Sequence, residues 1–150
     1  MGRARACVRP GRPGRTGARG AFAEGTVRRG AGQAGGDGRA AGVDVGRVRI
    51  SKEFTGGPTG SSVVRMPSVL DGASGPAAYV AVERVTGSPA GRQGSFALRH
   101  AAPGSHGERP AIRVVEGTGS GGPEGITGVF EPEVDEEGWH GHVLDYALNR

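Results

Sequence analysis

Short runs of alternating apolar and polar residues, separated by links rich in Gly and Pro, make up the chain from about residue 20 onward. Alternation with a period of two is typical of β-strands that bury one face, and the excess of Val over Leu favours strands as well. No window carries the 3.6-residue apolar period of a helix. We predict eight strands: Gly20–Arg28, Gly46–Thr55, Ser61–Pro67, Ala77–Val85, Gln93–His100, Pro110–Glu116, Ile126–Val134 and Trp139–Leu148.

The links between these strands decide the architecture. They are short and rich in turn-forming residues, as in Thr55–Gly60 and Thr86–Gly91. Eight short, evenly spaced strands are typical of a sandwich or an up-and-down barrel, and hairpin-type links favour the barrel. We therefore predict an all-β domain over residues 20–150, a small closed antiparallel β-barrel of about eight strands.

Alternation also assigns side chains to faces of the predicted strands. The sets that share a face are Val48, Ile50 and Phe54; Phe96, Leu98 and His100; and Leu144, Tyr146 and Leu148 with His140 and His142. The fourth strand permits two assignments, with either Tyr79, Ala81, Glu83 and Val85 or Val80, Val82 and Arg84 pointing inward. The first assignment would place the Glu83 carboxylate inside the barrel.

Residues 1–19 differ from the rest in composition and charge. The chain holds 31 Gly and 10 Pro, and its net charge of +4 hides a division into a basic first third and an acidic remainder. Gly and Pro are interspersed among the Arg residues of this tail, and no aromatic residue offers a stacking surface. The tail is either a basic arm that binds nucleic acid without sequence preference or a disordered segment, and we predict a disordered tail.

Several motifs in the second half of the chain resemble one bacterial family. They are Ala78–Gly87 (AYVAVERVTG), Gly91–His100 (GRQGSFALRH), the segment Val114–Gly128 with its GTGSGG run, and the closing His142–Leu148 (HVLDYAL). Together they resemble the domain-of-unknown-function 3224 family, most strongly over residues 46–148. The resemblance implies a small closed barrel similar to allene oxide cyclase and leaves association into a homo-oligomer open, but it implies no activity. The Gly-rich loop from Gly30 to Gly42 departs from the family pattern.

Common catalytic and metal-binding patterns are excluded or weak. The loop Gly117–Gly122 is predicted to be a turn, because neither a Lys-Ser/Thr pair nor a helix follows it, as a phosphate-binding loop requires. There is no Gly-x-Ser-x-Gly nucleophile elbow, and Cys7 lies in the tail. His140 and His142 form an H-x-H pair that Glu83 or His100 could complete, yet we interpret them as polar residues at a barrel mouth. We predict neither a metal nor a cofactor.

Three classes of function remain. They are a barrel that binds a small, partly apolar molecule, a cofactor-free isomerase or cyclase in the same pocket, and a structural or interaction protein with a filled core. Binding is the preferred hypothesis, and whether the protein is an enzyme stays open. The candidate ligand-binding residues are Glu83, Arg84, His100, His142 and Tyr146. The alternative for them is a hydrogen-bonded network that fixes strand register.

The predicted setting follows from absences in the sequence. No apolar leader or membrane-length apolar run is found, and one Cys cannot form an intramolecular disulfide. We expect a cytoplasmic protein that meets no membrane and no specific nucleic acid, with a small-molecule ligand or a second copy as its partner.

Overall fold

The computed structural model describes residues 21–29, 33–40, 43–56, 59–70, 76–89, 91–102, 109–134, 136 and 140–149. These residues form strands and turns, with no helix among them. The ten strands are β1 (Ala21–Arg29), β2 (Gln33–Ala40), β3 (Val43–Gly56), β4 (Thr59–Leu70), β5 (Pro76–Ser88), β6 (Gly94–Ala102), β7 (Ala111–Val114), β8 (Ser120–Gly121), β9 (Ile126–Val134) and β10 (His140–Leu148).

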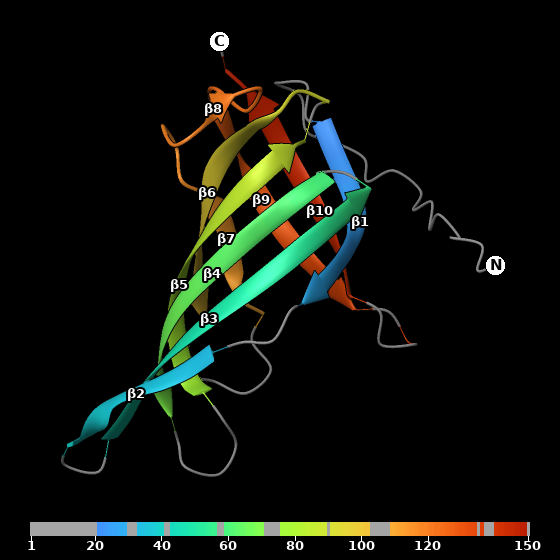
Figure 1. The fold of residues 1–150 in the computed structure, drawn as a ribbon. Coiled ribbons are helices and arrows are strands. Elements are labelled where there is room, and N and C mark those ends of the chain that lie inside the picture. The colour runs from blue at the N-terminus through green and yellow to red at the C-terminus, as the bar shows by residue number, and fades with distance from the viewer. Residues whose placement is uncertain are drawn as a thin grey trace.

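All ten strands belong to one antiparallel sheet. The order is β1-β10-β9-β7-β6-β5-β4-β3-β2, with β8 paired to β6. Chain neighbours from β2 to β6 lie side by side, and β3, β4 and β5 form the long strands of Figure 1. β1 pairs with β10 along residues 21–26 and also with β3 along residues 25–29. The predicted all-β antiparallel fold is confirmed, whereas a strand order that ends at β1 and β2 does not by itself establish the closed barrel.

Each of the eight predicted strands is present, and two more strands correct the prediction. The segment interpreted as a Gly-rich loop contains β2, which pairs with β3 and has an irregularity between Gly36 and Arg39. Gly has a low intrinsic β-propensity, so this strand depends on the edge that β3 offers. The second addition, β8, is only two residues long and pairs with Gly94 and Ser95 of β6.

The loop Gly117–Gly122 is part of the turn region that joins β7 to β9, as predicted. Gly121 has a φ of +69°, and a Cβ there would lie 2.6 Å from the backbone oxygen of Gln93. A residue with a side chain would be both strained and crowded at this position. Glycine therefore lets β8 approach β6 closely, which explains the motif without a phosphate.

Burial follows the predicted alternation and defines an inner and an outward face of the sheet. Along β6 the side chains of Phe96, Leu98 and His100 are buried, while Arg99 is exposed. On β5 the structure selects the first of the two assignments, with Glu83 at 0% exposure and Val82 at 59%. The core on the inner face is formed by Phe54, Val85, Phe96, Leu98, Ile112, Val114, Ile126, Phe130, Leu144 and Tyr146.

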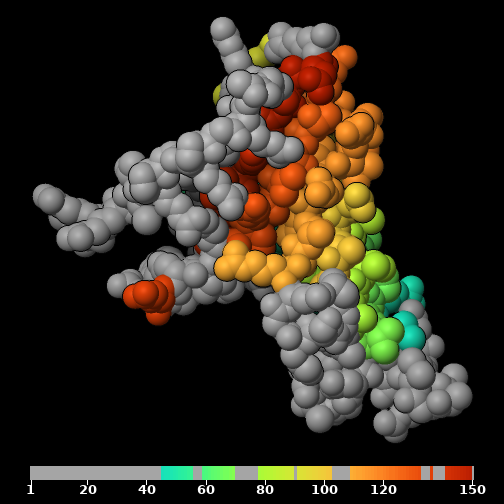
Figure 2. Space-filling model, turned by 180° about the vertical axis from the view of Figure 1, so that it is seen from behind, coloured from blue at the N-terminus to red at the C-terminus, as the bar shows by residue number. Residues whose placement is uncertain are grey.

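Seen from behind, several of these strands form a continuous surface (Figure 2). In Figure 2, residues of β7 and β9, in orange, adjoin those of β5 and β6, in green and yellow. The predicted tail, residues 1–19, lies outside the described residues. In the part of the chain that the structure describes, we find no helix with the length and apolarity needed to cross a membrane.

Candidate functional site

Four polar side chains meet on the inner face of the sheet, and we call them the polar cluster: Lys52, Ser62, Glu83 and His100. They come from the adjacent strands β3, β4, β5 and β6. The Lys52 Nζ donates a hydrogen bond to Glu83 Oε2 at 3.0 Å, and the Ser62 hydroxyl donates to Oε1. The Nε2 atom of His100 lies 2.7 Å from Glu83 Oε2. One carboxylate thus organises groups from three neighbouring strands.

The Glu83 carboxylate is ionised at neutral pH. Burial acts to raise its pKa, but the contact with His100, the charge of Lys52 and the Ser62 hydrogen bond outweigh burial and lower the pKa from its ordinary 4.5 to about 2. A general base works best when its pKa is near the operating pH. Glu83 is therefore suited to hold and orient the neighbouring Lys52 ammonium group and the Ser62 hydroxyl, and poorly suited to transfer protons.

His142 lies in an aromatic environment on β10. Its ring stacks on Phe130 at a centroid distance of 5.1 Å and meets Phe54 edge-to-face at the same distance. Phe54 and Phe130 also contact each other, at 6.2 Å. With an exposure of 2%, His142 is an integral part of the core.

Tyr146 and Arg84 lie apart from the polar cluster. The Tyr146 hydroxyl donates a hydrogen bond to the Pro89 carbonyl oxygen at 3.0 Å, and burial raises the pKa of this hydroxyl. Tyr146 therefore ties β10 to the turn after β5. Arg84 is exposed on the outward face, since it follows the inward-facing Glu83 on the same strand. Of the five predicted site residues, the structure brings Glu83 and His100 into direct contact.

Two members of the polar cluster, Lys52 and Ser62, were not predicted from the sequence. The alternation did indicate their position. Lys52 is two residues from Ile50 and from Phe54, and Ser62 is two residues from Val64, so each shares a strand face with apolar side chains. Both are buried, at 8% and 4% exposure. A charged or polar side chain is usually expected to be exposed. Lys52 and Ser62 are buried because both donate hydrogen bonds to Glu83, which is on another strand.

The inner face changes character along the strands. On one side of the polar cluster it is filled by side chains with at most 2% exposure, among them Phe54, Val85, Phe96 and Ile126. On the other side several inward-facing residues are only partly buried, next to the buried Gly46 and Ser68, and we call these partly buried residues the partly exposed end: Val48, Met66, Tyr79, Ala102, Pro110 and Pro132. The polar cluster lies between these two parts.

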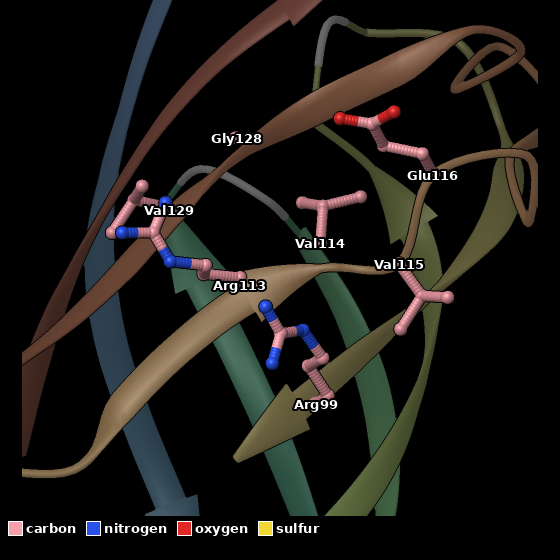
Figure 3. A pocket seen from close by; sticks show the side chains of 7 residues that line it. All are labelled: Arg99, Arg113, Val114, Val115, Glu116, Gly128 and Val129. Atoms are coloured by element: carbon pink, nitrogen blue, oxygen red, sulfur yellow. The ribbon is translucent and has the colours of Figure 1, made fainter. Parts of the chain in front are cut away.

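Two surface hollows are found on the outward face. One, of about 450 Å³, is lined by Arg99, Arg113, Val129 and the turn residue Glu116, among others. Figure 3 shows the side chains of Arg99 and Arg113 beside each other in this hollow. The other, of about 270 Å³, is lined by Arg49, Arg65 and Arg84 together with Ser and Val side chains.

Metal binding finds no support among the described residues, where no group of three His, Cys, Asp or Glu side chains is placed to hold an ion. The side chain of His140 lies outside the described residues. Whether His140 and His142 could bind a metal together is therefore not tested by the structure.

A profile of the family described as "Protein of unknown function (DUF3224)" matches residues 23–146. The chain belongs to this family. A solved DUF3224 structure from Shewanella oneidensis, of a protein with unknown function, is similar, with 27% identity and a TM-score of 0.74. The match covers 88% of this chain and 99% of that one. Among curated proteins no match was found.

Membership in the DUF3224 family confirms the resemblance drawn from the motifs. The matched range, residues 23–146, also includes the segment before residue 46, where the motifs were thin. The β1 and β2 strands account for this, because both lie in that segment and pair with β3. The family adds no activity, so function has to be argued from the site.

The lowered pKa of Glu83 makes stability depend on pH. A carboxyl group with a folded-state pKa of about 2 and an ordinary pKa of 4.5 stabilises the fold above pH 4.5, and this contribution is lost as the pH falls toward 2. The shift corresponds to about 3 kcal/mol. We expect the difference in free energy of unfolding between wild type and Glu83→Gln to shrink by that amount between pH 6 and 2. Urea titrations at several pH values measure it.

A matched control for this pH dependence is Glu53→Gln. Glu53 follows Lys52 on β3 but is exposed on the outward face. The free energy of unfolding of Glu53→Gln should change with pH in the same way as that of wild type. A Glu83→Gln difference that stays constant from pH 6 to 2 would contradict the assignment of an ionised, partnered carboxylate.

Proposed function

We propose that this protein binds a small, partly apolar molecule at the partly exposed end of the sheet's inner face, above the polar cluster. The carrying observation is the position of that cluster, between a filled core and partly exposed apolar residues. Ligand sites commonly combine an apolar lining with a few polar groups that orient the ligand. Here Val48, Met66 and Tyr79 supply the lining and the polar cluster supplies the orientation.

The proposal includes closure of the sheet into a barrel. β1 pairs with both β10 and β3, so eight strands, without β2 and β8, can be followed in a ring of antiparallel pairs. An eight-stranded barrel has an interior that is either filled by side chains or holds one small ligand. The filled part of the inner face corresponds to an interior closed by side chains, and the partly exposed end corresponds to an interior with room for a ligand.

The chemistry of the ligand follows from the residues at the edge of the cluster. Glu83 has no exposed surface, whereas Lys52 and His100 retain 8% and 7%. The Lys52 ammonium group has three N–H donors, of which one is directed at Glu83. An approaching molecule therefore meets donors and positive charge. We expect a ligand with an apolar body and a carboxylate or carbonyl oxygen.

Catalysis is the weaker alternative. An isomerase or cyclase needs a group that accepts and returns a proton, and the low pKa of Glu83 does not suit that role. A structural protein with a filled core remains the competing hypothesis, since the core cluster occupies much of the inner face. The experiment below separates binding from this hypothesis.

We expect Met66→Trp to weaken ligand binding at least about tenfold, because the larger side chain fills the partly exposed end. The probes are a panel of aliphatic and aromatic carboxylic acids with their matched primary amides, screened by ligand-observed NMR and thermal shift. Val69→Trp is the control, because Val69 is on the same strand but faces outward, with 41% exposure. It should leave binding unchanged.

The outcomes distinguish the hypotheses. Binding of the acids that Met66→Trp abolishes and Val69→Trp preserves supports the proposed site. Equal binding to both variants places the site elsewhere and overturns the proposal. If no probe binds wild type, the structural hypothesis is favoured.

A further inference from the structure

Arginine side chains form a row across five strands on the outward face. Arg49 of β3 is directly opposite Arg65 of β4, Arg65 is opposite Val82 of β5, Val82 is opposite Arg99 of β6, and Arg99 is opposite Arg113 of β7. Four of the five positions in this register are therefore arginines, and we call those four the arginine row. All four are exposed.

Within β3–β7 no acidic residue lies beside this charge, whereas Glu131 of β9 and Asp145 of β10 are exposed on the same face beyond the row. The described outward positions one step to either side of the row on β3–β7 include two further arginines, Arg47 and Arg84, and no Asp or Glu. Among the described residues, Arg49, Arg65, Arg84, Arg99 and Arg113 make no ion pair. Glu116, in the turn after β7, lines the hollow of Arg99 and Arg113, and no Asp or Glu is among the described residues that line the other hollow.

The direct pairing of like charges is costly without an anion. Two like charges opposite each other on neighbouring strands destabilise a sheet, and the row contains two such pairs, Arg49 with Arg65 and Arg99 with Arg113. Each pair lines one of the two outward hollows. An anionic group that enters a hollow would be held by two guanidinium groups, whose planar N–H donors suit phosphate oxygens.

The length of the row indicates the class of ligand. Measured along the surface of the sheet, four strand spacings from β3 to β7 amount to about 19 Å, and the two hollows are about three spacings, or 14 Å, apart. A ligand that contacts both hollows therefore has to follow the curvature of the sheet. A single phosphate or a small metabolite cannot reach both hollows. An extended chain with regularly repeated negative charges can.

We propose that the arginine row binds the phosphate backbone of a nucleic acid, without sequence preference. Interfaces with nucleic acids are strongly positive, whereas interfaces between proteins gather aromatic residues at their centre. The row and its described flanking positions contain no aromatic residue. Without stacking surfaces, bases are not read, and phosphate contacts alone carry no sequence information. This surface faces away from the proposed small-molecule site and does not depend on it.

The test compares three double variants of the full chain. Arg49→Gln/Arg65→Gln and Arg99→Gln/Arg113→Gln each remove one opposed pair. Arg92→Gln/Arg109→Gln removes the same charge from exposed positions outside the row. The probe is a fluorescent oligodeoxythymidine of about 20 nucleotides, long enough to span the row. Fluorescence anisotropy gives the dissociation constant over a range of salt concentrations, and thermal unfolding confirms that each variant is folded.

We expect each pair in the row to weaken binding about tenfold at physiological salt and to lower the slope of log K against log salt by about 1.4, because two phosphate contacts are lost. The control pair should change both quantities much less. Binding should be the same for a mixed-sequence oligonucleotide of equal length.

Three results would overturn the proposal. Equal losses in all three variants would show that net charge or another segment, such as the basic tail, carries the binding. Equally tight, row-dependent binding of poly-glutamate would assign the row to an acidic protein partner. A wild-type protein that does not bind the oligonucleotide at low salt has no such site.

Discussion

Replacing Glu83 by leucine is expected to lower the free energy of unfolding by about 3–5 kcal/mol at neutral pH, because it leaves a buried ammonium group without its counter-ion. Lys52 is 8% exposed and donates to Glu83 at 3.0 Å. The same substitution also removes the acceptor of the Ser62 hydroxyl and the contact of His100. Urea denaturation measures the loss.

The double variant Lys52→Met/Glu83→Leu tests the cause. Replacing both members of a buried ion pair with apolar side chains of similar size is often neutral, whereas breaking the pair is not. We therefore expect the double variant to recover most of the stability lost in Glu83→Leu. If the two substitutions add up instead, the loss comes from packing around residue 83 and not from the uncompensated charge.

The polar cluster also shows what the sequence could and could not predict. Alternation along β5 permitted two face assignments, and only the pairing of the strands in the sheet decides between them. Val82 is exposed and Glu83 is buried, which is the reverse of the usual preference of Val for the interior and Glu for the surface. An exposed Val beside a fully buried Glu is explained by partners on β3, β4 and β6. These partners are 31, 21 and 17 positions away in the chain, so no local pattern links them to Glu83.

The strands themselves were easier to predict than their partners. β6 was predicted to within two residues at either end, since Phe96, Leu98 and His100 alternate cleanly with small or charged neighbours. β2 was missed because its Gly residues carry no alternation, and its existence depends on the pairing with β3. Likewise, nothing near Tyr146 in the sequence indicates Pro89, whose carbonyl oxygen accepts its hydrogen bond.

The arginine row illustrates a property that needs both levels. The sequence shows isolated Arg residues on separate strands, and only the registers of four strand pairs bring them into one line. Shifting any strand by one residue would turn its Arg to the inner face, because side chains alternate between faces. The core therefore determines the outward charge pattern as well, since the buried residues fix the register.

The core can be tested at Phe96, which is 2% exposed and belongs to the central apolar cluster. Phe96→Ala is expected to lower the free energy of unfolding by about 3–5 kcal/mol, through lost apolar burial and the cavity left behind. The residue opposite on β5, Val85, is itself 1% exposed, so the cavity would open inside the packed face. Stabilities of natural domains are about 5–15 kcal/mol, so this loss is a large fraction of the total.

Val82→Ala is the control for Phe96→Ala, because Val82 lies on the neighbouring strand β5 but is 59% exposed. Its effect should stay within about 0.5 kcal/mol, as for most exposed positions. Equilibrium urea unfolding of both variants, followed by circular dichroism, gives the comparison. A loss below about 1 kcal/mol for Phe96→Ala would mean that Phe96 is not packed in the core. The face assignment of β6 would then have to be reversed, and with it the placement of His100 beside Glu83.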